Sequence, residues 1–79
     1  MPRYHFNTSD GQVVRDPQGF ECADLAEAKQ RAVRIAGETL TTLADDLFQT
    51  DFRLEVTNDA GLTLFSIFVV ATEAPAVKA

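Results

Sequence analysis

The sequence predicts an α+β fold in two layers, in which one amphipathic helix packs on a four-stranded, mainly antiparallel sheet in the order ββαββ. Two observations lead to this prediction. Residues 24–44 repeat apolar side chains at the three-and-four spacing of a helix. On both sides of that segment, short stretches alternate apolar and polar residues and are separated by turn sequences. A helix with one apolar stripe buries that stripe against one face of such a sheet.

Size and composition favour a single small globular domain. The chain has 79 residues, of which 46% are apolar and 24% charged, as in ordinary globular proteins. We expect the domain to comprise residues 1–72, followed by a flexible tail over residues 73–79. The net charge of -5 disfavours nucleic acid as a partner, because phosphate binding draws on clustered Lys and Arg. A single cysteine and the lack of a signal-peptide pattern favour a cytoplasmic location.

The first part of the chain has the pattern of a hairpin. Residues 3–7 alternate, with Tyr4 and Phe6 on one side. Residues 9–11 and 16–19 have turn chemistry, with Asp and Gly in both and Pro at the second position of the later one. A short second strand over residues 12–15 fits between them, and Phe20 or Cys22 is expected under the start of the helix.

The helix is marked at both ends. Asp24 followed by Glu27 is an Asp variant of the capping box, and extension past residue 45 would put Asp46 on the apolar face. Lys29 falls inside the apolar stripe, where its stem covers apolar surface while the ammonium reaches water. The apolar face comprises Leu25, Ala28, Ala32, Ile35, Ala36, Leu40, Leu43 and Leu47.

Two arginines of the helix are expected on its outer face. Arg31 lies four residues after Glu27, and Arg34 lies four residues before Glu38. These spacings predict surface ion pairs worth a few tenths of a kcal/mol.

The last strand is the most informative part of the sequence. Residues 52–57 alternate, residues 58–61 form a hairpin turn, and residues 62–70 continue as a strand that is apolar on both faces. The apolar run 62–71 is too short to span a membrane as a helix. One face is expected to carry Thr63, Phe65, Ile67 and Val69, and the other Leu62, Leu64, Ser66, Phe68 and Val70.

A strand that is apolar on both faces needs cover on both. One helix covers only one face, so we expect a second copy of the chain on the other; the alternative is that the tail folds back over it. The candidate interface residues are Leu64, Phe65, Ile67, Phe68 and Val69.

The residues that could support catalysis are few. His5 is the only histidine, and the turn residues Asp10 and Asp16 are its candidate partners. One histidine and two turn-forming aspartates are neither a metal set nor a catalytic triad, so we expect no catalytic, cofactor or metal site and no enzymatic activity. Cys22 is interpreted as a buried hydrophobic residue.

Two further charged groups are interpreted as surface features. The acidic residues Asp45, Asp46 and Asp51 are taken as a solvated connection after the helix. Nucleic-acid binding would have to use five arginines that are scattered along the chain, and is therefore unlikely on this sequence: Arg3, Arg15, Arg31, Arg34 and Arg53.

Several motifs in order resemble a family of short bacterial proteins of unknown function, found mostly in alphaproteobacteria. They are the opening residues 1–6 (MPRYHF), the turns at 10–11 and 16–19, the segment 24–28 (DLAEA) and the hairpin 55–61 (EVTNDAG). The resemblance implies a bacterial cytoplasmic protein and brings no activity or catalytic residues.

The function expected from these observations is a non-enzymatic protein-interaction module that forms a homodimer. Two alternatives remain. Residues 20–36 are similar to the strand-to-helix unit of HicB-type antitoxins, which bind a partner toxin. The other alternative is a domain that binds a small ligand through His5 and a nearby Asp.

Overall fold

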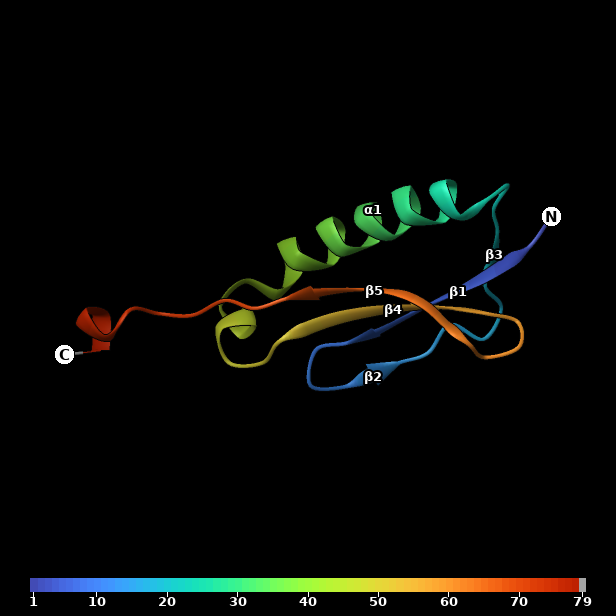
Figure 1. Ribbon diagram of the computed structural model, residues 1–79. Coiled ribbons are helices and arrows are strands. Elements are labelled where there is room, and N and C mark those ends of the chain that lie inside the picture. The colour runs from blue at the N-terminus through green and yellow to red at the C-terminus, as the bar shows by residue number, and fades with distance from the viewer. Residues whose placement is uncertain (79) are drawn as a thin grey trace.

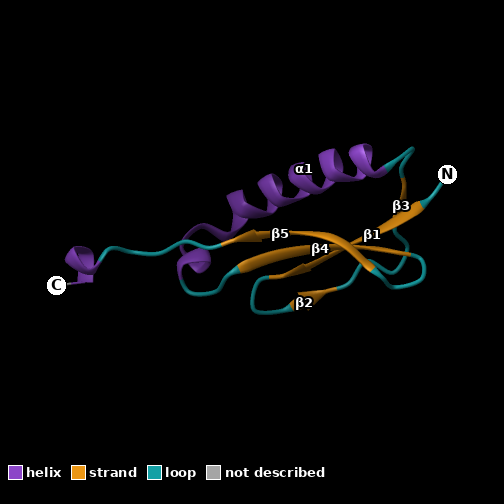
Figure 2. Ribbon diagram, viewed as in Figure 1, coloured by secondary structure: helices purple, strands orange, loops and turns teal. Residues whose placement is uncertain are grey.

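The computed structural model describes residues 1–78, apart from the side chains at positions 44, 45 and 78. It confirms the predicted α+β fold, with one long helix on one side of an antiparallel sheet (Figures 1 and 2). In chain order the elements are β1 (Arg3–Ser9), β2 (Val13–Val14), β3 (Phe20–Glu21), α1 (Leu25–Leu43), the 3-10 turn η1 (Ala44–Phe48), β4 (Phe52–Asn58), β5 (Thr63–Val69) and the 3-10 turn η2 (Pro75–Lys78).

The sheet has the strand order β2-β1-β4-β5, and β3 also pairs with β1. All of these pairings are antiparallel. β1 pairs with β4 along most of its length, from Tyr4 opposite Asn58 to Ser9 opposite Arg53. The first strand is therefore internal, and β5 lies at an edge of the sheet.

The two predicted turns before the helix form around glycines. Gly11 has φ +103° and Gly19 has φ +72°, values that L side chains rarely adopt. The later turn is held by Asp16, whose carboxylate accepts hydrogen bonds from the amides of Gly19 at 3.0 Å and Phe6 at 3.2 Å. This single side chain thus fastens the 16–19 turn to β1.

The helix begins at the predicted cap. The amide of Glu27 donates to the Asp24 carboxylate at 2.9 Å, and the Glu27 carboxylate accepts from the amide of Ala23 at 3.1 Å. The helix ends at Leu43, one residue before the predicted end, and continues as η1. The apolar face is as predicted except at Leu25, which is 41% exposed because it lies at the first position, beyond the sheet.

The core lies between α1 and the middle of the sheet. Phe52, Leu54 and Val56 of β4 are fully buried, as are Ala28 and Ala32 of the helix. The small helix residues let the helix axis approach the sheet closely, so the large β4 side chains fill the space between the layers. Cys22 is also fully buried in this core, as predicted, whereas Phe20 is 45% exposed.

The structure shows which face of β5 belongs to the core. Phe65, Ile67 and Val69 pack against the core and are half-buried, while Phe68 is exposed on the opposite face and Leu64 is exposed at an irregularity of the strand. The predicted alternation fails at Thr63. A register shift lies between Thr63 and Phe65, so that Thr63 pairs with Thr57 rather than lying on the core side with Phe65.

The segment after β5 runs away from the sheet, and η2 lies beyond the end of the domain (Figure 1). Val70 is 56% exposed at the start of this segment. The alternative that the tail folds back over the outer face of β5 is therefore wrong in this structure. The predicted boundary at residue 72 and the flexibility of the tail stay predictions.

Candidate functional site

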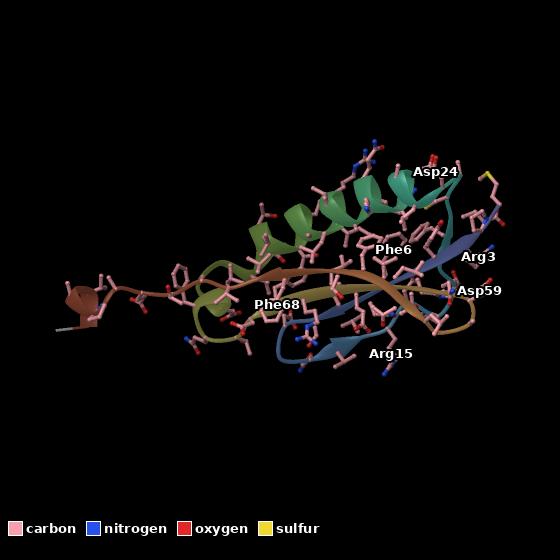
Figure 3. All side chains as sticks on the ribbon, viewed as in Figure 1. Arg3, Phe6, Arg15, Asp24, Asp59 and Phe68 are labelled. Atoms are coloured by element: carbon pink, nitrogen blue, oxygen red, sulfur yellow. The ribbon has the colours of Figure 1, made fainter. Side chains whose placement is uncertain are left out.

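The outer face of β5 is an exposed apolar surface on the side of the sheet away from the helix. Leu64 is 41% exposed, Phe68 51% and Val70 56%. The guanidinium of Arg53, on the neighbouring strand, lies over the Phe68 ring with its carbon 5.0 Å from the ring centre. In Figure 3, Phe6 points into the space between sheet and helix, whereas Arg15 points to the other side. The second layer thus covers only one face of the sheet.

The free edge of β5 adjoins this apolar face. Within the described part of the chain β5 pairs with β4 alone, so its other edge presents the unpaired backbone groups that characterise an edge strand. Natural edge strands are commonly protected by charges, Pro or short length. β5 is seven residues long and contains neither a charged residue nor Pro.

The five predicted interface residues fall into two sets. Leu64 and Phe68 are exposed, with Phe68 opposite Arg53 on the outer side of the sheet and Leu64 at the register shift. Phe65, Ile67 and Val69 face the helix side and are only partly covered by it. The strand is therefore incompletely covered on both faces.

His5 is held between two acceptors. Its Nδ1 donates to the carbonyl oxygen of Asp16 at 2.8 Å, and its Nε2 donates to the carboxylate of Asp59 at 2.8 Å. Because both partners are acceptors, the protonated imidazolium satisfies both hydrogen bonds. The hydrogen bond to Asp59 raises the pKa of His5 above its ordinary value of 6.5, and the Asp16 carbonyl adds to the rise, while burial opposes it.

The predicted partners of His5 are only partly correct. Asp16 contacts His5 through its backbone, because its carboxylate is engaged in the turn. Asp10 follows the opposite end of β1, about 16 Å away at the rise per residue of a strand, and accepts instead from the amide of Gln12. Asp59 was missed, because only the pairing of β1 with β4 brings its hairpin beside His5. The turn sequence at 58–61 was visible, but its neighbour in space was not.

Two hollows lie on the outer face of the sheet, and Arg15 lines both. One lies beside His5 and Asp59, and the other beside Arg53 and Glu55. Both are open and shallow. At the start of β1, the Arg3 guanidinium forms an ion pair with the Glu21 carboxylate at 3.1 Å and donates a hydrogen bond to the Gln18 carbonyl at 2.8 Å.

The ion pairs predicted for the outer face of the helix are not those that the structure shows. Arg31 lies over the ring of Phe20, with its guanidinium carbon 4.4 Å from the ring centre. Among the described residues, the ion pairs are Arg3–Glu21 and His5–Asp59, so the predicted pairs of Arg31 and Arg34 are wrong. The physical reason at Arg31 is that Glu27 serves the helix cap. Lys29 is exposed.

The remaining candidates take no part in a site. Asp46 and Asp51 are exposed after the helix, and the side chain of Asp45 lies outside the described part of the chain. No three His, Cys, Asp or Glu side chains gather where they could hold a metal ion in the described residues. Within the same residues, no helix is long and apolar enough to cross a membrane.

Comparison with protein families adds a decisive observation. A family model described as Domain of unknown function (DUF6894) matches residues 3–71. The chain belongs to this family. The DUF6894 match begins at the first residue of β1 and ends two residues after β5, so it includes the whole two-layer domain. A search of curated proteins and a search of solved structures found no significant match.

Proposed function

We propose that this DUF6894 protein is a non-enzymatic protein-interaction module that self-associates through β5. The observation that carries the proposal is the state of this strand: it is an edge strand without a charged residue, and its apolar side chains Leu64 and Phe68 are 41% and 51% exposed. Burying apolar surface of this kind stabilises an interface by about 25 cal/mol per Å² before the costs of association. A second copy supplies an identical edge, which makes a two-fold dimer self-complementary.

The arrangement around His5 supports a structural rather than a catalytic role. Both of its ring nitrogens are engaged, one by a backbone carbonyl and one by a carboxylate. A general base needs a nitrogen free to take a proton from a substrate or nucleophile. In this proposal His5 fastens the 16–19 turn and the β4–β5 hairpin to β1, and the protein works in the bacterial cytoplasm.

The experiment that tests self-association is the mass in solution, measured by light scattering over a wide range of protein concentrations. We expect the mass of two chains at high concentration and dissociation on dilution. Phe68→Asp should shift the protein to the mass of one chain. The matched control is Val13→Asp, which places the same charge on a 67% exposed apolar residue of β2. A wild-type protein with the mass of one chain at every concentration would overturn the proposal.

A further inference from the structure

We infer that the second copy joins edge to edge, with the two β5 strands pairing antiparallel into one continuous sheet and the two α1 helices meeting side by side above them. This inference rests on the proposed function, since it requires that the chain self-associates. It adds a specific arrangement and a second contact layer, made by a flank of α1 that the monomer leaves open.

The contact between Arg31 and Phe20 fixes the orientation of the helix. Phe20 lies in β3, which pairs with β1 on the side away from β4, so the Arg31 side of the helix faces β1. Two positions along a helix turn by about 200°, so Val33 lies nearly opposite Arg31 around the axis. Since α1 packs over β4 and β5, Val33 faces the free edge of β5.

This flank of the helix is mostly apolar and open. Val33 is 63% exposed, and a Cβ added to Gly37 would meet nothing within 4 Å. Lys29 is the one charged residue on this side of the helix. We define the free flank as the residues that share this side by their three, four and seven spacing, of which Leu40 also packs against the core: Ala26, Lys29, Gln30, Val33, Gly37 and Leu40.

The distribution of charge supports a second copy of this chain as the partner. Two chains that each carry a net charge of -5 repel one another, so a stable contact requires a surface free of acidic residues. The free flank and β5 contain no Asp or Glu. The outer and β1-facing sides of the helix carry Glu27, Arg31, Arg34 and Glu38. Only the β5 side of the helix is therefore suited to an identical partner.

The dimensions also fit. Adjacent strands lie about 4.8 Å apart, so pairing of two β5 strands brings the helices, each above β4 and β5, to an axis separation of about 10 Å. Packed helices lie 8–10 Å apart. The seven-residue strand is about 23 Å long, and a contact of that length across both layers buries roughly 1,000 Å² in total, the size of a weak, reversible interface.

The position of Gly37 gains an explanation in this arrangement. Gly inside a helix is destabilising relative to Ala, and nothing in the monomer lies close enough to require it. Val33 and Gly37 are one turn apart near the middle of α1. In an antiparallel helix pair, Val33 of each copy lies against Gly37 of the other, where the lack of a side chain lets the helices approach.

The test is site-specific cross-linking of single-cysteine additions. Val33→Cys should be joined into covalent dimers by a short bis-maleimide, whereas Arg34→Cys, one residue along and about 100° around the axis on the outer side of the helix, should be joined much less. The wild type is the blank, because Cys22 is fully buried. A wild-type monomer overturns the proposed function. A wild-type dimer in which Val33→Cys is joined no more than Arg34→Cys overturns only this arrangement and leaves self-association intact.

A second variant, at Gly37, tests the contact between the two helices independently of cross-linking. Gly37→Gln should raise the Tm of the isolated chain, because Gln has the higher helix propensity, and should weaken dimerisation at least tenfold by placing a long side chain between the helices. Arg34→Gln is the matched control and should leave the dimerisation constant unchanged. A Gly37→Gln protein that dimerises as tightly as the wild type would rule out the helix contact.

Discussion

His5 in β1 and Asp59 in the β4–β5 hairpin are 54 positions apart in the sequence, yet the imidazole nitrogen and the carboxylate oxygen lie 2.8 Å apart. The imidazole is mostly covered, with 17% of its side chain exposed, whereas 71% of the Asp59 side chain is exposed. The same ring also binds the 16–19 turn through its other nitrogen. One histidine therefore links three segments at one end of the sheet.

This relationship predicts that stability falls as the pH rises above 6.5 and through the raised pKa of His5. The pKa of His5 is raised in the folded chain relative to the ordinary value of 6.5. Its contribution to the free energy of unfolding is therefore fully present below pH 6.5 and is lost as the pH rises through the folded pKa. The pKa can be measured by NMR, since His5 is the only histidine, and the stability by urea unfolding at a series of pH values.

The substitution Asp59→Asn tests whether the Asp59 carboxylate is what raises the pKa of His5. The amide keeps the size of the side chain but loses the charge, so we expect the pKa of His5 to fall toward its ordinary value and the pH dependence of stability to shrink. Asp10→Asn removes a turn carboxylate that does not contact His5 and should leave that pKa unchanged. Equal effects of the two substitutions would contradict this account.

Two glycines with positive φ give a matched pair of predictions. At Gly61, φ is +85° and a Cβ would meet nothing within 4 Å, so Gly61→Ala should cost only the left-handed penalty of about 1–2 kcal/mol. At Gly19, φ is +72° and a Cβ would lie 2.8 Å from the backbone oxygen of Tyr4. Gly19→Ala should therefore cost about 1–3 kcal/mol more. Urea unfolding measures both, and equal losses would show that the turn relaxes.

Loss of the helix cap at Asp24 should lower the free energy of unfolding by less than Gly19→Ala does. Asp24→Ala removes the acceptor for the amide of Glu27 and should lower the free energy of unfolding by about 1 kcal/mol. Glu38→Ala removes an exposed acidic residue from the same helix without a cap contact and should leave stability within about 0.5 kcal/mol. Thermal unfolding followed by circular dichroism distinguishes the two.

The helix and the main strands were predictable because their signals are local. The spacing of Ala28, Ala32 and Ala36 and the alternation of Phe52, Leu54 and Val56 are fixed by the periods of helix and strand. The capping box at Asp24 is likewise contained within four residues. No distant part of the chain alters these patterns.

The order of the strands was not predictable, and the site depends on it. That Asp59 lies beside His5 follows from the pairing of β1 with β4. That Phe20 lies beneath Arg31 follows from the pairing of β3 with β1. The sequence showed that β5 is apolar on both faces, but only its register with β4, which puts Ile67 opposite the buried Leu54, shows that Ile67 is covered and Phe68 exposed.

The final prediction compares these two neighbours on β5. Ile67 pairs with the fully buried Leu54, so Ile67→Asp puts an uncompensated charge against the core. That costs several kcal/mol, a large part of the total stability of a small domain, typically 5–15 kcal/mol, and we expect the chain to unfold. Phe68→Asp places the charge in solvent beside Arg53, so the fold should persist and the dimer should dissociate.

Circular dichroism and light scattering together separate the two outcomes. Ile67→Asp should lose its folded spectrum, while Phe68→Asp should keep the wild-type spectrum and have the mass of one chain. Leu64→Asp changes another exposed apolar residue of the same strand, at the register shift, and should also keep the fold and dissociate the dimer. If Phe68→Asp and Leu64→Asp both remained dimeric and folded, these two side chains would lie outside the contact. A dimer would then have to form through the strand edge and the helix flank alone.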